Sequence, residues 1–104
     1  MDEVLRALAA SARRDILTLV WRNERTAGEI AAKFQMTRPA VSQHLGVLLA
    51  SQLVSVRREG TRRFYLANRE TLARLRSALA TLWDERLMLL RDAAEAAERK
   101  QRRR

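Results

Sequence analysis

Apolar residues recur at helical spacing through the first half of the chain, and this pattern predicts a series of short helices. The first is expected over residues 4–10. Ser11, a residue type that favours the N-cap position, is expected to begin the second. The apolar positions are Val4, Leu5 and Leu8 in the first helix and Ile16, Leu17 and Val20 in the second.

Two further helices carry clear start signals. Thr26 and Glu29 have the spacing of a capping box and predict the start of a third helix. Thr37 is expected to cap a fourth helix over residues 37–51, with Pro39 in its first turn, where the missing N–H costs nothing. Their apolar residues are Ile30, Ala31 and Phe34, then Val41, Leu45, Leu48 and Leu49. Two short helices joined by about three residues form a helix-turn-helix pattern.

The helical pattern then gives way to residues typical of strands, which predict a β-hairpin. One strand is expected over residues 53–59, Gly60 supplies the turn, and residues 62–66 form the returning strand. Four arginines surround the tip of this hairpin, namely Arg57, Arg58, Arg62 and Arg63. Such a tip is poorly suited to a core and well suited to phosphate groups.

Residues 69–99 contain neither Pro nor Gly, and their apolar stripe predicts one long amphipathic helix. A helix of this length cannot be covered by so small a domain, and an identical helix of a second copy would cover it most economically. We therefore expect a homodimer through the terminal helices. The candidate dimerisation residues are Leu5, Leu8, Leu72, Leu75, Leu79, Leu82, Trp83, Leu87 and Leu90.

The formal net charge of +9 over 104 residues favours a polyanionic partner, either nucleic acid or an anionic membrane surface. Residues 69–98 hold 5 basic and 6 acidic residues, which disfavours a basic membrane-surface helix. The last six residues include five basic ones, so we expect a disordered tail over 99–104 after a single domain over 1–98. No apolar run is long enough to span a membrane and no signal-peptide pattern is present, so a cytoplasmic location is expected.

Residues for catalysis or metal binding are scarce in this chain. It contains no cysteine, which excludes disulfides, thiolate metal sites and cysteine nucleophiles. His44 is the only histidine, so one chain cannot supply two imidazoles to a site. We therefore expect no enzymatic activity, no metal and no cofactor.

With its helix-turn-helix and basic hairpin, the chain resembles the winged-helix transcriptional repressors of the ArsR/SmtB (arsenic-repressor) family of bacteria. The matching stretches are Leu8-Ala9, residues 13–17, residues 28–31, Arg38-Pro39-Ala40-Val41-Ser42-Gln43-His44-Leu45, and the hairpin from Leu53 to Tyr65. The resemblance implies a mainly helical winged helix-turn-helix, in which four helices are followed by the two strands of the wing and a last helix.

Two departures from the family pattern bear on function and on local strain. Metal sensors of this family carry a Cys-x-Cys pair at the positions of Thr26 and Gly28, and a second ligand set with histidine on the last helix. This chain has neither, so it resembles the metal-independent branch. Gln52 stands where many relatives place a helix-ending glycine, and a left-handed conformation there would cost about 1 kcal/mol.

The resemblance implies that the helix over 37–51 lies in the major groove of double-stranded DNA, with the hairpin along the flanking backbone. Arg38 would then be able to read guanine and Gln43 adenine. The candidate DNA-binding residues are Thr37, Arg38, Pro39, Ser42, Gln43, His44, Arg57, Arg58, Arg62 and Arg63. We expect a dimeric repressor that binds an inverted-repeat operator, and the family resemblance suggests repression of its own operon as a hypothesis. The sequence identifies no small-molecule effector.

Several alternatives remain open from the residues alone. Thr37 is more simply an N-cap, and His44 is as well explained by a structural contact as by DNA. Trp21, Trp83 and Met88 would line a ligand pocket if one exists, but apolar residues at helical spacing are usually core. At the level of function, the alternatives are a protein that coats DNA without sequence preference and a winged-helix module for protein–protein contacts.

Overall fold

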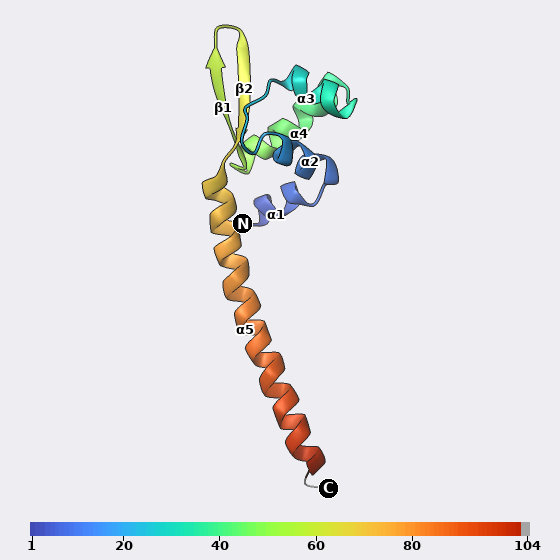
Figure 1. Ribbon diagram of the computed structural model, residues 1–104, viewed down its shortest axis with the longest axis vertical. Helices are drawn as coiled ribbons and strands as arrows, with labels where there is room; N and C mark the ends of the chain where they lie inside the picture. The colour runs from blue at the N-terminus through green and yellow to red at the C-terminus, as the bar shows by residue number, and fades with distance from the viewer. Residues whose placement is uncertain (103–104) are drawn as a thin grey trace. The chain divides into compact units, whose positions relative to one another are not determined.

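The structure is a computed structural model that describes residues 1–102. Its elements are α1 (Asp2–Leu8), α2 (Ser11–Leu19), α3 (Ala27–Phe34), α4 (Arg38–Ala50), β1 (Val54–Glu59), β2 (Arg62–Ala67) and α5 (Arg69–Arg102). Five helices and one antiparallel hairpin confirm the predicted mainly helical fold and its element order (Figure 1). Residues 1–73 form one compact unit, and α5 continues from it as a single uninterrupted helix.

The first helix lies two residues earlier than predicted, over Asp2–Leu8 instead of 4–10. Asp2 and Glu3 lie in its first turn, where negative charge interacts favourably with the positive end of the helix dipole. Ser11 is not an N-cap, because the chain is extended at Ala10 and Ser11 is already the first residue of α2.

Two arginines of α2 explain why the helices separate at Ala10. The Nε and Nη2 groups of Arg13 donate to the carbonyl oxygens of Ala7 and Arg6, at 2.7 and 3.0 Å. The Nη1 group of Arg14 donates to the Leu8 carbonyl at 2.7 Å. These bonds satisfy the last carbonyls of α1, which have no partner within that helix.

The predicted N-caps of the helix-turn-helix are confirmed. Oγ1 of Thr26 accepts from the Glu29 N–H and Oε1 of Glu29 accepts from the Thr26 N–H, both at 3.2 Å, which completes the capping box at the start of α3. Bonds from the backbone N–H and the hydroxyl of Thr26 lower the pKa of Glu29. At the start of α4, Oγ1 of Thr37 accepts from the Ala40 N–H at 3.3 Å.

Both helices of the helix-turn-helix end at a glutamine in the left-handed conformation. Gln52, where many relatives place a glycine, has a φ of 61°, and its N–H donates to the Leu49 carbonyl at 3.0 Å. The N–H of Leu53 donates to the Leu48 carbonyl at 2.9 Å, which completes a Schellman motif. Gln35, with a φ of 54°, ends α3 in the same way, and the sequence pattern did not reveal this.

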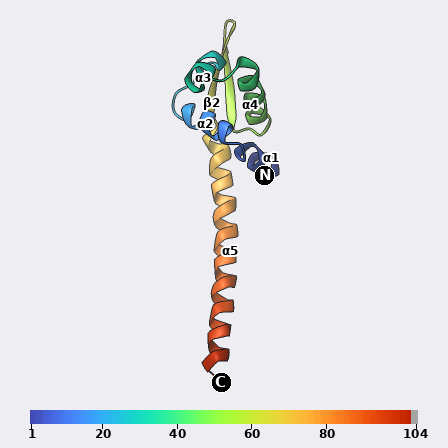
Figure 2. The same cartoon turned by 90° about the vertical axis from the view of Figure 1, so that its right-hand side faces the viewer.

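The hairpin packs beside the helix-turn-helix, with β2 against α3 and β1 against α4, while α3 and α4 also contact each other (Figure 2). Val54, Tyr65 and Ala67 on one of its faces are buried. An isolated β-bridge was not anticipated: Arg25 exchanges two backbone hydrogen bonds with Tyr65, at 2.8 and 3.0 Å. The largest fully buried side chains of the core are Ile16, Val20, Ile30, Val41, Leu45, Leu48 and Leu53.

The last helix continues beyond the expected domain end at residue 98. Residues 99–102, predicted to begin a disordered tail, are helical, while 103–104 lie outside the described part of the chain. Arg102 lies 3.7 Å from the Glu98 carboxylate one turn earlier, and basic residues in a last turn interact favourably with the helix dipole. No helix within residues 1–102 is both long and apolar enough to cross a membrane.

The left-handed turn at Gln52 gives a stability prediction. Replacing Gln52 with Gly removes the steric cost of the side chain at positive φ, so we expect the free energy of unfolding to rise by about 1 kcal/mol. For a domain of this size that corresponds to a rise in thermal midpoint of about 4–8 °C, measured by circular dichroism at one fixed protein concentration. Gln52→Ala, which keeps a Cβ, is the matched control and should give no gain; an equal gain from both variants would contradict this account.

Candidate nucleic-acid interface

Helix α4 presents a polar face to solvent, as its periodicity predicted. Arg38, Ser42 and Gln43 are exposed, whereas Val41 and Leu45 on the opposite side are buried in the core. The burial of the apolar face holds the helix against the domain. The side chains with hydrogen-bonding capacity therefore remain available to a partner.

Thr37 and His44, for which a structural role is an alternative to DNA binding, both make contacts within the chain. Thr37 is engaged as the N-cap of α4. His44 is half-buried, and its Nδ1 lies 3.5 Å from Nη1 of Arg13, the arginine that also binds the carbonyls of α1. His44 therefore connects α4 to the first two helices. Pro39, beside Thr37, is exposed in the first turn of α4.

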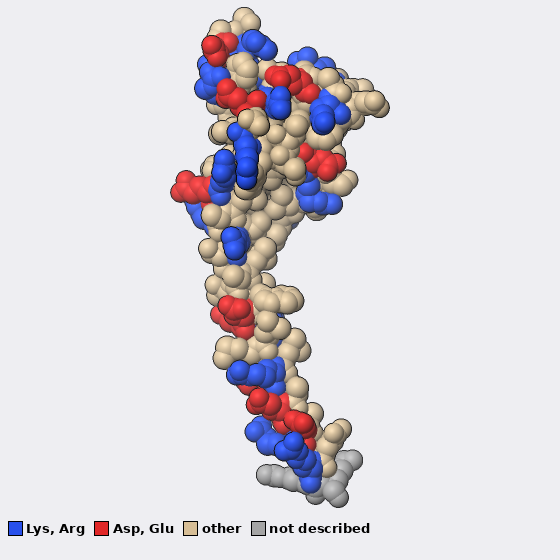
Figure 3. Space-filling model, viewed as in Figure 1, with Lys and Arg blue, Asp and Glu red and all other residues tan. Residues whose placement is uncertain are grey.

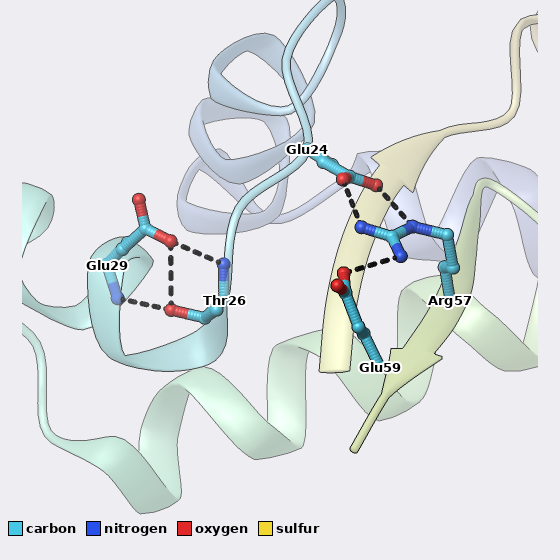
Figure 4. A network of polar contacts seen from close by, with 5 residues as sticks. All are labelled: Glu24, Thr26, Glu29, Arg57 and Glu59. Atoms are coloured by element: carbon cyan, nitrogen blue, oxygen red, sulfur yellow. Dashed lines mark hydrogen bonds and ion pairs between the residues drawn. The ribbon is translucent and has the colours of Figure 1, made fainter. Parts of the chain in front are cut away.

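Arg57 is tied to the domain by two carboxylates (Figure 4). Its Nη2 and Nε donate to the two oxygens of Glu24 at 2.6 and 3.2 Å, and its Nη1 donates to Glu59 at 2.9 Å. The guanidinium carbon also lies 4.7 Å from the centre of the Phe64 ring. The hydrogen bond from Arg57 and its positive charge lower the pKa of Glu24, and the two carboxylates raise the pKa of Arg57.

This arrangement bears on the expectation for the hairpin tip. Arg57, predicted to bind phosphate with its three neighbours, is paired with Glu24 and Glu59 in the free chain, and its role in DNA binding stays a prediction. Glu24 lies in the link between α2 and α3, so the ion pair joins the wing to the helical part of the domain. The sequence could not reveal the pair, since Glu24 and Arg57 are 33 residues apart.

Arg58 and Arg63 stand directly opposite each other on the other face of the hairpin. Like charges at such a cross-strand position repel each other and destabilise a sheet. Within residues 1–102, no carboxylate pairs with either of them. The cost is recovered when an anion binds, so this arginine pair favours an anionic partner at the wing.

A cavity of about 400 Å³ brings α4 and the wing together. Arg38 and Ser42 from α4 line it, together with Arg62 and Arg63 from β2. Four of the ten predicted DNA-binding residues are therefore neighbours in space, although they come from segments about 20 residues apart in the sequence.

Charge is mixed on the face of the molecule that Figure 3 draws. On the face drawn, acidic and basic side chains alternate over the helices and the wing, consistent with the pairs that Glu24 and Glu29 form with Arg57 and Arg25. The net basic charge alone therefore does not locate a binding surface, and the arginines without a carboxylate partner are more informative.

Most of the predicted dimerisation residues are exposed in the single chain. Leu82, Trp83 and Leu90 have exposed fractions of 50%, 66% and 67%. Leu5, Leu79 and Leu87 are also exposed and Leu8 and Leu72 are half-buried, but Leu75 is already buried. Trp83 and Met88 are thus not core residues, and Trp21 lines a groove of about 550 Å³ beside Leu17 and Leu72.

A metal site needs several ligating side chains close together. In the part of the chain that the structure describes, no three side chains of the His, Cys, Asp and Glu types come together as a metal site would require. Thr26 and Gly28 lie at the start of α3, where the capping box uses the Thr26 oxygen.

The Glu24–Arg57 pair gives a prediction about the wing. Glu24→Gln removes the charge at nearly constant shape, so we expect greater mobility at the hairpin tip, measured by backbone ¹⁵N relaxation. Because folding lowers the pKa of Glu24, the pair stabilises the native state above pH 4.5 and this contribution is lost as pH falls through the lowered pKa. The difference in thermal midpoint between Glu24→Gln and the wild type should therefore be present at pH 7 and shrink on acidification.

Glu98→Gln, which removes an exposed ion pair of α5, is the control. A wing that is equally mobile in both variants would contradict the account that the Glu24–Arg57 pair holds the wing.

Comparison with known proteins supplies the family. Residues 10–56 match the family described as bacterial regulatory protein, arsR family. The HTH-type transcriptional regulator Rv2034 of Mycobacterium tuberculosis is 41% identical over 86 residues, which cover 83% of this chain and 80% of that protein. The transcriptional repressor SdpR of Bacillus subtilis is 35% identical over 72 residues, covering 69% of this chain and 80% of SdpR.

A solved structure agrees with these relatives. The homodimeric winged helix-turn-helix DNA-binding domain of Mb0332 from Mycobacterium bovis, a possible ArsR-family regulator, has a TM-score of 0.65 and 35% sequence identity. The match covers 81% of this chain and 78% of that one. Together with the capped α3–α4 pair and the adjoining wing, these similarities show that the chain belongs to the arsR family of bacterial regulatory proteins and is a winged helix-turn-helix transcriptional regulator.

Proposed function

We propose that the protein is a dimeric, sequence-specific repressor that binds double-stranded DNA without requiring a metal. One observation carries the proposal: the exposed polar face of α4 adjoins a wing whose Arg58 and Arg63 face each other without a carboxylate. Phosphates of a DNA backbone would relieve this repulsion. SdpR, which is similar over most of its length, is named as a repressor.

Recognition of the DNA sequence rests on α4. In the docking mode typical of helix-turn-helix proteins, the recognition helix enters the major groove and its N-terminal residues approach the base edges. Gln43 is exposed there and has the donor and acceptor pair that reads adenine, worth about 1–3 kcal/mol of discrimination. Ser42, on the same face, suits a shorter contact to a base or a phosphate.

Dimerisation rests on α5. Its exposed apolar residues form a stripe that water solvates poorly, and a second copy of the same helix is the economical cover. The similar domain of Mb0332 is homodimeric. A two-fold dimer reads an inverted repeat whose half-sites are centred about one helical turn of DNA apart, or a multiple of it. Bound at a promoter, it would repress by excluding polymerase, which needs no catalytic residue.

Independence from metal is inferred from the side chains that could act as metal ligands. The chain has no thiolate to offer, a single imidazole, and a capping threonine and a glycine at the positions where the sensors place their cysteines. Release from DNA would therefore depend on another signal or on concentration.

DNA binding is tested by fluorescence anisotropy. The labelled duplexes are the region upstream of the gene and a scrambled copy, at about 150 mM salt, with and without a chelator. We expect a preference of roughly 10³-fold for the upstream duplex, unchanged by the chelator. Equal weak binding to both would favour a DNA-coating protein, and binding to neither would contradict the proposal and favour a protein–protein module.

The dimer is tested by charge insertion into the apolar stripe. Leu87→Arg places a charge among apolar side chains of the partner, so we expect dimerisation to weaken by at least roughly tenfold, measured by sedimentation velocity. Met88→Arg is the matched control, because the next residue lies about 100° further round the helix, away from the stripe. If Leu87→Arg remained as dimeric as Met88→Arg, α5 would not form the interface.

A further inference from the structure

The cavity between α3, α4 and the wing carries more positive charge than the chain itself can balance. Arg38, Arg62 and Arg63 line it, together with the hydroxyl-bearing residues Ser42 and Thr61. The guanidinium carbon of Arg62 also lies 5.2 Å from the centre of the Phe64 ring. No aspartate or glutamate lines it. The nearest part of α3 is its first turn, at Gly28.

Arg38 lies directly against the backbone of α3 at Gly28. A Cβ built on Gly28 would lie 3.1 Å from Nη1 of Arg38 and 3.7 Å from its guanidinium carbon. Gly28 does not have a positive φ, so its backbone would accept alanine without strain. A methyl group at this position would therefore displace the Arg38 guanidinium by a few tenths of an ångström from the place that it occupies beside Gly28.

This location is unfavourable for a cation unless an anion joins it. Arg38 is the first residue of α4 and touches the first turn of α3, so its charge lies near the positive ends of two helix dipoles. Arg62 and Arg63 add two more positive charges to the same cavity. A bound anion with several oxygens would turn this repulsion into charge-assisted hydrogen bonds.

We propose that the cavity holds one phosphate group of the DNA backbone, with Arg38 as its main ligand and Gly28 as the residue that positions Arg38. The proposal rests on the DNA-binding function above and deepens it. It also replaces the role expected for Arg38 from the sequence, because a guanidinium held against α3 positions the protein on DNA and does not read guanine. Ser42 and Thr61 would donate their hydroxyl hydrogens to the same phosphate.

The test compares Gly28→Ala, Arg38→Ala and the double variant on the upstream and scrambled duplexes over a range of salt concentrations. Each single variant should weaken binding roughly tenfold on both duplexes alike. The slope of log K against log salt should fall by about 1.8 for the dimer, which is about 0.9 for the one phosphate held by each protomer. In the double variant Gly28→Ala should add nothing, because it acts only through Arg38. Arg38→Lys should recover part of the slope, since it keeps the charge without the planar fork.

Two controls separate this role from general damage. The thermal midpoint of Gly28→Ala should equal or exceed that of the wild type, because alanine favours a helix more than glycine does. Arg22→Ala, which removes an exposed cation from a different groove, should lower the salt slope much less. Duplexes with single neutral methylphosphonates should reveal one phosphate in each half-site whose neutralisation weakens the wild type but not Arg38→Ala.

A second measurement keeps this proposal separate from the proposed function. Inorganic phosphate alone, added to the full chain, should shift the ¹⁵N signals of the Gly28 amide and Arg38 Nε in the wild type but not in Gly28→Ala. If phosphate shifts neither signal and the salt slope is unchanged in the variants, the phosphate site is wrong even where the protein binds DNA. Loss of preference on the upstream duplex alone would show that Arg38 reads a base, which also overturns the proposal. Phosphate shifts without DNA binding would overturn the proposed function and, with it, the assignment of the site to DNA.

Discussion

The left-handed turn at Gln52 is the constraint on which the relation of α4 to the wing depends. It ends α4, reverses the chain and directs Leu53 into the core beside Leu48, with both side chains fully buried. β1 then starts against the helix that it follows. Because a short domain buries little surface, these few buried contacts decide at what angle the wing meets α4.

A second connection holds the wing from the other side. The link between α2 and α3 contributes the backbone of Arg25 to the sheet through Tyr65, and it contributes the side chain of Glu24 to Arg57. The wing is therefore tied both to the end of α4 and to the beginning of α3. A hairpin of two strands has little stability alone, so these ties allow the arginines at its tip to hold a defined position.

The arginines of the domain divide according to whether the chain balances their charge. Arg13 and Arg14 bind the carbonyls at the end of α1, and Arg57 is paired with two carboxylates. Arg58 and Arg63 have no such partner within residues 1–102, and both belong to the wing. A surface ion pair adds little stability, but it decides which cations remain available to a polyanion.

The sequence by itself determined the order of the elements, the caps at Thr26 and Thr37, the hairpin and the apolar stripe of α5. These depend on neighbouring residues, whose spacing is visible in the chain. The predicted N-cap of α2 at Ser11 was wrong by one residue, because the chain is extended at Ala10 and already helical at Ser11. Only the tertiary structure decided that Arg57 is tied to Glu24 and that Arg38 lies against Gly28. Both contacts join residues of different secondary-structure elements or loops. No local pattern in the sequence predicts such partners, because only the folded geometry brings them together.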